Sequence, residues 1–194
     1  MGAIIESFIV LFVIMDPIGN IPLILSLTKG MPAAAIRKNI NSSVFVAGVL
    51  LFIFLFFGLK VLGFFGIDIN SFQIAGGIIL LILGILYVLG ISGKIVKSHG
   101  ADLSVPIGTP LLTGPGVIVT TIILVMEKGI WTTAIAAALT LLAAWLILLN
   151  SIRLYKLFGE HWTDVISRVM GIILAAIAVR FITNGVLHIA APLL

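Results

Sequence analysis

Two proline- and glycine-rich stretches hold the residues of this chain that could bind a ligand. The first is Met15-Asp16-Pro17-Ile18-Gly19-Asn20-Ile21-Pro22, and the second is Thr109-Pro110-Leu111-Leu112-Thr113-Gly114-Pro115-Gly116. Each lies inside a long apolar segment, and a proline within a helix removes a backbone donor and clashes with the preceding turn. Neither segment can therefore form one unbroken helix. The first stretch also carries a carboxylate, Asp16, which costs about 2.5–3.5 kcal/mol at the centre of a membrane helix on insertion scales.

A break in a helix leaves backbone N–H and C=O groups without helical partners, and these groups can bind a charged ligand. Within a membrane, such groups must be packed in protein or line a cavity. The half-helix after a break offers free N–H groups and a positive dipole end to a carboxylate. Gly114-Pro115-Gly116 suits this role because proline favours the first helical position, and Gly19-Asn20-Ile21-Pro22 would play the same part in the first segment. The C=O ends of the preceding half-helices suit an ammonium group, so a site with both ends matches a zwitterion.

The polar side chains of the two stretches have alternative roles. Asp16 could hold a substrate ammonium group or exchange a coupling proton, or it could cap the following half-helix. Asn20 and Thr113 are expected to line the site, with capping again as the alternative. The predicted substrate-binding residues are Asp16, Pro17, Gly19, Asn20, Thr113, Gly114, Pro115 and Gly116.

Arg180 and Asn184 lie on one face of the last apolar segment. An arginine within a membrane usually has a partner, so we predict that Arg180 pairs with Asp16, as a charge partner or in ion coupling. The alternative is that Arg180 extends outward to the membrane surface. There is no cysteine, the carboxylates are scattered, and no His/Asp/Glu spacing suits a metal. We therefore expect no enzyme, no metal site and no cofactor.

The composition is that of a membrane protein, with 61% hydrophobic and 9% charged residues. A helix needs about 20 apolar residues to cross a bilayer core. Four runs without any charge are long enough to cross: Asn39–Leu59, Ile69–Gly93, Leu103–Met126 and Gly129–Ile152. Two further segments, Ile4–Thr28 and Ile166–Leu187, cross if they tolerate charged residues such as Asp16 and Arg180. Six membrane helices follow from this count.

The basic residues predict the orientation of these helices. One set of loops carries eight of them, Lys29, Arg37, Lys38, Lys94, Lys97, Arg153, Lys156 and Arg168, and the other set carries only Lys60 and Lys128. Because basic loops stay in the cytoplasm, both termini are predicted to lie outside. The net charge of +4 is dispersed over these loops, which does not indicate a nucleic-acid partner.

Proline, glycine and charged residues predict the element boundaries. Arg37 and Lys38 suggest that a short interfacial helix precedes the second membrane helix, and glycines in the third suggest close helix packing. The expected elements are an interfacial helix at Ala33–Asn41, membrane helices at Asn41–Val61, Ser71–Ile91, Trp131–Ile152 and Val165–His188, and an amphiphilic loop at Arg153–Asp164.

The two halves of the chain resemble each other. Gly77-Ile78-Ile79-Leu80 recurs as Gly171-Ile172-Ile173-Leu174, and Asp16-Pro17 corresponds to Gly114-Pro115. We predict an all-α membrane protein of two three-helix repeats, residues 1–95 and 105–194, joined by a linker at 96–104. Because three crossings are an odd number, the second repeat is inverted. Helices 1 and 4 break near the midplane; the alternative is that they form re-entrant hairpins. Paired broken helices in inverted repeats are typical of secondary transporters.

The two motifs together resemble those of the MarC/SnatA family, and the resemblance covers the whole chain. It implies a transporter of the inner membrane, with small neutral amino acids such as glycine, alanine and serine as the substrates reported for some members. We therefore expect alternating-access transport of such a substrate, coupled to H⁺ or Na⁺. The partners would be this amino acid and the lipid bilayer, and a homo-oligomer is left open. A passive pore for small solutes and a non-transporting membrane scaffold are the rival hypotheses.

Overall fold

Helices form the regular structure of the residues that the computed structural model describes, which are 2–21, 24–25, 28, 31–90 and 112–190. This confirms the all-α prediction for that part of the chain. The helices are α1 (Gly2–Met15), α3 (Ala33–Phe64), α4 (Ile69–Val88), α7 (Pro115–Lys128), α8 (Ile130–Leu149) and α9 (Ser151–Ala190). The predicted linker at 96–104, Pro22 and Pro110 lie outside the described residues.

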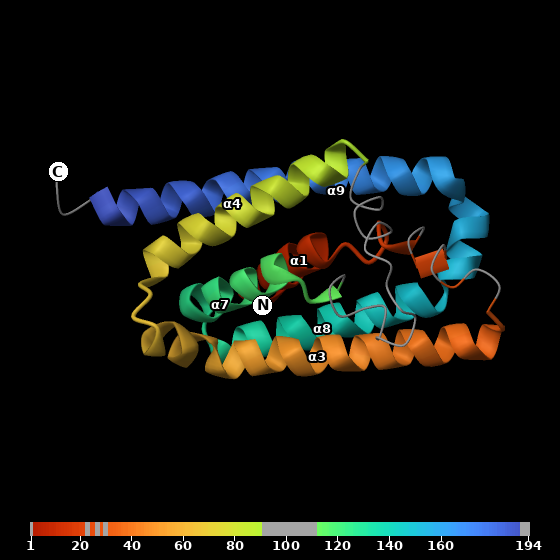
Figure 1. Cartoon of the computed structure of the whole chain (residues 1–194), viewed down its shortest axis with the longest axis horizontal. Helices are drawn as coiled ribbons and strands as arrows, with labels where there is room; N and C mark the ends of the chain where they lie inside the picture. The colour runs from red at the N-terminus through yellow and green to blue at the C-terminus, as the bar shows by residue number, and fades with distance from the viewer. Residues whose placement is uncertain (1, 22–23, 26–27, 29–30, 91–111, 191–194) are drawn as a thin grey trace.

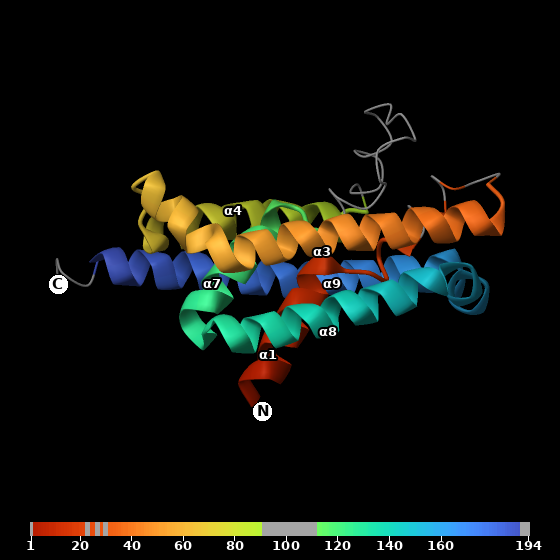
Figure 2. The ribbon, with the colours of Figure 1, turned by 90° about the horizontal axis from the view of Figure 1, so that it is seen from below.

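Two pairs of long helices enclose two short ones (Figure 1). The helices α3 and α8 form one pair, and α4 and α9 form the other. Between the pairs lie α1 and α7, which contact each other and helices of both pairs. Figure 2 shows that α1 runs steeply across the long axis of the bundle toward its middle. The two short helices, each next to one of the sequence motifs, therefore occupy the centre.

Helix length separates the outer pairs from the central helices. Four helical segments are long and apolar enough to cross a membrane: Ala33–Phe64, Ile69–Val88, Ile130–Leu149 and Asp164–Ala190. In contrast, α1 and α7 have 14 residues each. At 1.5 Å per residue this is about 21 Å, short of a hydrocarbon core of about 30 Å. Neither central helix can cross a bilayer by itself.

Two predicted boundaries are wrong. The expected interfacial helix Ala33–Asn41 is continuous with the next helix, and together they form α3. No proline or glycine lies between Ala33 and Gly48 to interrupt it. The expected loop Arg153–Asp164 is helical and belongs to α9. The chain turns there at Gly159, whose φ of 74° suits glycine, so a single non-helical residue replaces the predicted loop.

The start of α4 is set by a side-chain cap. Asp68 Oδ1 accepts hydrogen bonds of 3.0 Å from the N–H groups of Asn70 and Ser71. The hydrogen bond from the Ser71 side chain, together with these amides, holds the pKa of the Asp68 carboxyl below its usual value. The cap satisfies first-turn amides that would otherwise lack partners.

Glycines allow the backbones of α4 and α9 to touch. A methyl group added at Gly84 would lie 2.8 Å from the Gly171 carbonyl oxygen, and one added at Gly77 would lie 2.8 Å from that of Ala178. One added at Gly185 would lie 2.7 Å from the Asn70 carbonyl oxygen. Small residues at such positions bring membrane helices close together, as the sequence predicts for Gly77 and Gly84.

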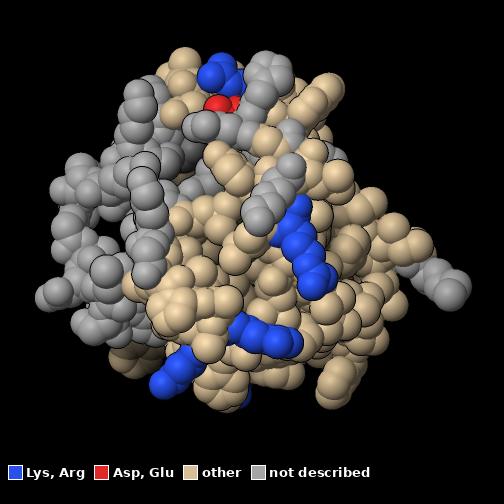
Figure 3. All heavy atoms as spheres, turned by 90° about the vertical axis from the view of Figure 1, so that its right-hand side faces the viewer, with Lys and Arg blue, Asp and Glu red and all other residues tan. Residues whose placement is uncertain are grey.

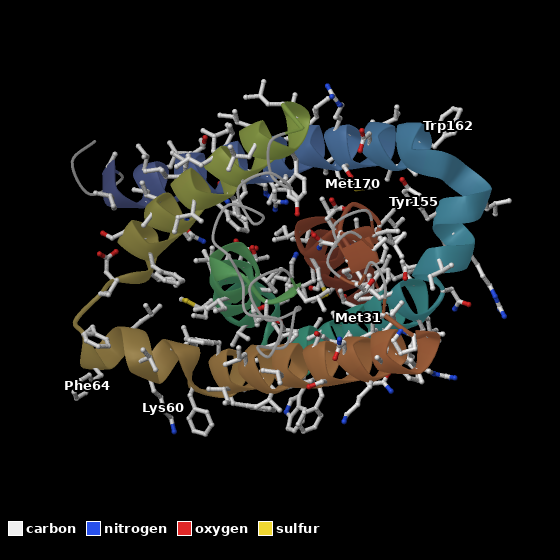
Figure 4. The ribbon with its side chains drawn as sticks, turned by 45° about the vertical axis from the view of Figure 1, so that its right-hand side comes forward. Met31, Lys60, Phe64, Tyr155, Trp162 and Met170 are labelled. Atoms are coloured by element: carbon white, nitrogen blue, oxygen red, sulfur yellow. The ribbon has the colours of Figure 1, made fainter. Side chains whose placement is uncertain are left out.

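The two ends of the bundle differ in charge. Figure 3 shows the end that holds the start of α3, where basic side chains predominate over acidic ones. Arg37, Lys38 and Arg153 are exposed there. Tyr155 and Trp162 lie at the same end, on the turned part of α9, whereas Lys60 and Phe64 lie at the opposite end (Figure 4). The basic and aromatic residues thus gather where a membrane–water interface would lie.

Candidate functional site

The first helix ends at Asp16. Its last helical residue is Met15, and Asp16 has a φ of 39°, the only positive φ of a described residue other than glycine. Aspartate tolerates this left-handed region better than most residues. Helix-type bonds then recur, because Ile24 N–H donates to Asn20 C=O and Thr28 N–H donates to Ile24 C=O. The chain therefore leaves the helix at Asp16 and regains helical bonding about one turn later.

Only one of the two carboxylate oxygens of Asp16 has a hydrogen-bond partner. Its side chain is 2% exposed. Oδ1 accepts a 3.0 Å hydrogen bond from Gly19 N–H, whereas Oδ2 is buried and has no hydrogen-bond partner. The predicted capping role is thus present, in the form of one local bond. The second oxygen remains available to a ligand.

Asn20 and Thr113 fasten the two breaks to backbone carbonyls. Asn20 Nδ2 donates a 3.0 Å hydrogen bond to Met15 C=O, across the break, and Asn20 is 3% exposed. Thr113 Oγ1 donates a 2.9 Å bond to Ala47 C=O in the middle of α3. Pro17, which lies between Asp16 and Asn20 in sequence, is also buried. Both side chains therefore position the backbone, and the Thr113 bond fixes the second break against α3.

Helix α7 begins directly after the second break. Gly114 is its N-cap with an extended backbone, Pro115 is in its first turn, and no side chain caps it. The first backbone bond runs from Ile118 N–H to Gly114 C=O. Residues 116–117 and 119–125 are buried, so the positive end of this helix lies within the protein. This matches the helix start predicted at Gly114-Pro115-Gly116, and the binding of a carboxylate there stays a prediction.

The two breaks lie next to each other. A methyl group added at Gly116 would lie 2.7 Å from Leu80 of α4 and 3.5 Å from Ile14, in the last turn of α1. The C-terminal end of α1 and the N-terminal end of α7 are therefore neighbours in the central layer. Since helix ends carry opposite partial charges, the arrangement sets a negative end beside a positive one.

Comparison with known proteins agrees with the motifs. The model of the MarC family, described as MarC family integral membrane protein, matches residues 1–190. The chain belongs to the MarC family. It is similar to a UPF0056 membrane protein of Archaeoglobus fulgidus, with 33% identity over 92% of this chain and 90% of the relative. The UPF0056 membrane protein YhcE of Escherichia coli is 34% identical over 97% of this chain and 94% of the relative.

A third relative is similar to about the same degree. A UPF0056 membrane protein of Methanocaldococcus jannaschii is 33% identical over 94% of this chain and 86% of the relative. No solved structure matches the chain. With its family and its several long apolar helices, the chain is an integral, multi-pass membrane protein.

Two residues beside Asp16 were missed by the sequence analysis of this MarC family protein. A methyl group added at Gly19 would overlap Asp16 Oδ2 and lie 2.5 Å from Ser167 Oγ of α9. Tyr87, in the last turn of α4, lies within electrostatic reach of the Asp16 carboxylate. Neither residue belongs to a motif, and each is far from Asp16 in sequence. Helix packing alone brings them to the break.

Unpartnered polar atoms gather in the central layer. Besides Asp16 Oδ2, the buried hydroxyls of Ser7 in α1 and Thr120 in α7 have no hydrogen-bond partner. The neighbouring Thr121 donates to Val117 C=O of its own helix at 2.7 Å, whereas Thr120 makes no such bond. A buried polar atom without a partner costs about 1–3 kcal/mol. Three of the four such atoms in the described residues thus belong to the first segment and α7, and the fourth, Ser151 Oγ, belongs to α9.

The predicted pairing of Arg180 with Asp16 is wrong. Arg180 Nη1 lies 3.9 Å from Glu6 Oε1, and its side chain is 60% exposed. Glu6 also accepts a 2.9 Å hydrogen bond from Lys128 Nζ. Asp16 lies near Ser167 through Gly19, and 13 residues of α9 separate Ser167 from Arg180, about 20 Å along a helix. Asn184 lies one turn further on and is half-buried.

The described residues hold no group of three or more His, Asp or Glu side chains that could bind a metal ion. The polar atoms that converge near the breaks are one carboxylate, hydroxyls and backbone groups. Such a set suits hydrogen bonding to a charged organic ligand.

Proposed function

We propose that this protein is a secondary active transporter of a small neutral amino acid of the glycine, alanine and serine class. Transport would proceed by alternating access, coupled to H⁺ or Na⁺. The observation that carries the proposal is the buried, unpartnered Oδ2 of Asp16 at a helix break. A carboxylate oxygen at this depth needs a proton or a cationic group to offset its desolvation. A substrate ammonium group supplies one.

The neighbouring helix ends complete a site for a zwitterion. The last carbonyls of α1 favour the ammonium group, and Val13 C=O loses its helical donor because Pro17 has no N–H. The uncapped first turn of α7 favours the carboxylate. Gly116 brings this turn against Ile14, so one small molecule could reach both ends. The substrate-binding set remains Asp16, Pro17, Gly19, Asn20, Thr113, Gly114, Pro115 and Gly116.

Contacts between α4 and α9 support the inverted repeat. If Gly77 corresponds to Gly171, then Gly84 corresponds to Ala178. The close approaches are Gly77 to Ala178 and Gly84 to Gly171, which are the same contact with the repeats exchanged. Such reciprocal contacts are those of a two-fold axis. Contacts of the other helices also recur when the repeats are exchanged. The first broken segment packs on α8 of the second repeat, and the second broken segment packs on α3 of the first repeat.

Contacts at the two ends favour broken segments that cross the membrane over re-entrant hairpins. Near its start, the first segment pairs Glu6 with Lys128, at the turn between α7 and α8. Near its end, Met31 Sδ accepts a hydrogen bond from Asn39 at 3.6 Å, at the start of α3. These places lie at opposite ends of the bundle (Figure 1). The two contacts support a first segment that crosses the membrane, as two repeats at 1–95 and 105–194 require.

The proposal includes the location and partners of the protein. We place it in the inner membrane with the basic end in the cytoplasm, so that both termini lie outside. The partners are the amino acid and the bilayer, and a homo-oligomer is compatible with the exposed apolar faces. No resident cofactor and no enzymatic reaction form part of the proposal.

Two rival functions make different predictions. A passive pore would show neither saturation nor any response to an ion gradient. A membrane scaffold would move no amino acid, and changes at Asp16 would alter stability alone. The unpartnered carboxylate oxygen favours transport over both rivals. A wide pore would hydrate this oxygen, and in a scaffold no ligand would offset the free-energy cost of burying it.

Uptake into proteoliposomes tests the proposal. Labelled glycine and alanine are supplied with or without an imposed proton or sodium gradient. Wild type should show saturable, gradient-driven uptake, and Asp16→Asn should lower it about ten- to a hundredfold, the range for a lost hydrogen bond to a charged group.

The matched control is Asp164→Asn, the same change at an exposed position on α9, which should transport as wild type does. Gel filtration must show that both variants remain folded. If neither amino acid moves under any gradient, the proposed function is wrong. Full uptake by Asp16→Asn would remove Asp16 from the site.

A further inference from the structure

We propose that the interface between α1 and α7 is the path by which the amino acid reaches Asp16 from the end of the bundle opposite the basic one. The hydroxyls of Thr120 and Ser7 line this path. The ion pair between Glu6 and Lys128 closes its outer end. The inference rests on the proposed function, and it adds residues that lie outside both sequence motifs.

Thr120 differs from the other buried threonines that the structure describes. Thr113 donates to Ala47 C=O. Four others donate to the carbonyl four residues earlier, as threonines in helices often do: Thr28, Thr121, Thr133 and Thr140. Thr120 is 0% exposed and its Oγ1 has no hydrogen-bond partner. Its hydroxyl is therefore left to a ligand.

The contacts of α7 show that Thr120 faces α1. Ile122 lies against α3, and Val119, about 60° further round the helix, lies against α4. Gly116 is about 60° beyond Val119 and lies against both α4 and Ile14 of α1. Thr120 is about 40° beyond Gly116 in the same sense. This direction leads away from α4 and toward α1.

Ser7 lies on the side of α1 that faces α7. It precedes Ile14 by seven residues, nearly two full turns, so the two side chains share one face of the helix. Ile14 lies against Gly116 of α7. Ser7 is 0% exposed, and its Oγ has no hydrogen-bond partner. A second hydroxyl without a partner therefore lies in the same interface.

The two hydroxyls lie between the breaks and the ion pair. One contact of the interface joins Ile14 to Gly116, next to the breaks. Another joins Glu6 to Lys128 at 2.9 Å, so α1 and α7 are antiparallel. Measured from the first contact toward the second, the hydroxyl-bearing residue of α7 is about 6 Å along the helix and that of α1 about 10 Å. Polar side chains therefore mark the interface from the breaks to its outer end.

A hydroxyl group suits either charged end of an amino acid. It donates a hydrogen bond to a carboxylate and accepts one from an ammonium group. Because neither hydroxyl has a partner within the protein, a zwitterion gains these bonds without displacing others. The path therefore suits a small zwitterion better than an apolar solute.

The ion pair is placed to close the path. It joins the first helix to the end of α7, and Arg180 Nη1 of α9 lies 3.9 Å from Glu6 Oε1. The side chain of Lys128 is 24% exposed and that of Glu6 is 43% exposed. Partly exposed ion pairs contribute little to stability, so this one can separate and form again as access alternates.

Cysteine accessibility tests the path, because the sequence contains no cysteine. The variants are Ser7→Cys, Thr120→Cys and the matched control Thr121→Cys. Thr121 is equally buried and next in sequence, but its hydroxyl bonds to Val117 C=O. Intact cells that express each variant are treated with membrane-impermeant 2-sulfonatoethyl methanethiosulfonate, with and without saturating glycine. Gel filtration shows which variants are folded, and Ser7→Cys, which exchanges only oxygen for sulfur, decides alone if Thr120→Cys is not.

The two path positions should be labelled and the control should not. Ser7→Cys and Thr120→Cys should react from outside, and glycine should slow both reactions because it occupies the path. Thr121→Cys should stay unlabelled, since a buried thiol is inert.

Loss of the ion pair should open the path more often. When Glu6→Gln is added to Thr120→Cys, labelling should become about two- to fivefold faster, the effect of one partly exposed ion pair. Glu127→Gln is the matched control, the same change at an exposed glutamate near the end of α7, and it should leave the rate unchanged. Equal rates in both double variants would show that the ion pair does not close the path.

The outcomes separate this inference from the proposed function. If wild type transports glycine but neither Ser7→Cys nor Thr120→Cys reacts in intact cells, the path is wrong and the transporter stands. Equal labelling of Thr121→Cys would also overturn the path, because accessibility would not follow the interface. If both path cysteines react selectively, yet no amino acid slows the reaction or is transported, the path to the breaks stands and the proposed function fails.

Discussion

Asp16 combines two unfavourable features at one position. Its backbone has a φ of 39°, and left-handed backbone costs an L-residue about 1–2 kcal/mol. Its buried Oδ2 has no partner, which costs about 1–3 kcal/mol more. Gly19 N–H offsets part of this through its bond to Oδ1. Costs of this kind persist at binding sites, where a ligand or a proton completes the set of interactions.

Gly19 should tolerate no side chain. We predict that Gly19→Ala lowers amino-acid uptake more than tenfold, because its methyl group would occupy the space between Asp16 Oδ2 and Ser167 Oγ. Uptake per folded protein is the measurement. Gly63→Ala is the matched control, since nothing lies within 4 Å of a methyl group there. Wild-type uptake by Gly19→Ala would show that the space beside Asp16 is not used.

The elements divide into a rigid frame and a central layer. The frame includes α4 and α9, whose backbones touch at Gly77, Gly84 and Gly171. The central layer consists of α1 and α7, which are too short to cross a bilayer and end or begin at the two breaks. The unpartnered hydroxyls of Ser7 and Thr120 lie in this layer. A site between short central helices can change shape while the outer pairs remain packed.

The glycine contacts of α4 and α9 should govern stability. We predict that Gly84→Ala or Gly171→Ala lowers the free energy of unfolding by about 1–3 kcal/mol, the cost of overpacking, because each methyl group would lie 2.8 Å from a carbonyl oxygen. Thermal unfolding in detergent measures the effect. In contrast, Gly48→Ala meets only Leu141 at 3.4 Å and should be neutral or stabilising, since alanine favours helix. Equal melting temperatures for all three variants would refute the close packing.

The whole molecule has one basic end and one end where acidic and basic residues pair. Arg37, Lys38 and Arg153 mark the basic end (Figure 3), and Glu6 joins Lys128 and Arg180 toward the other. The ion pairs are partly exposed, so each contributes little to stability, about 0–1 kcal/mol. These ion pairs connect the first helix to the second half of the chain.

Single introduced cysteines should reveal the orientation, because the sequence contains none. We predict that a membrane-impermeant maleimide labels Phe65→Cys in intact cells but labels Arg37→Cys only after the cells are opened. Both residues are exposed and lie at opposite ends of α3. The reverse labelling pattern would place the basic end outside and overturn the predicted topology.

Local chemistry allowed several features to be predicted from sequence. Apolar composition predicted a helical membrane protein, and the family match supports it. The helix end at Asp16 and the helix start at Pro115 follow from proline, which acts on its own turn. The packing role of Gly77 and Gly84 follows from their size. In each case the physical cause lies within a few residues of the position itself.

Other features depend on how helices pack. Ser167 of α9 lies close to Gly19 beside Asp16, and Tyr87 of α4 lies within electrostatic range of Asp16, yet no spacing in the sequence relates them. Arg180 pairs with Glu6 because packing places it about 20 Å along α9 from the Asp16 break. The sequence by itself determined the class of protein and the two breaks, since those depend on local backbone chemistry. Only the tertiary structure decided which side chains meet at the breaks, since those contacts join residues that only helix packing brings together.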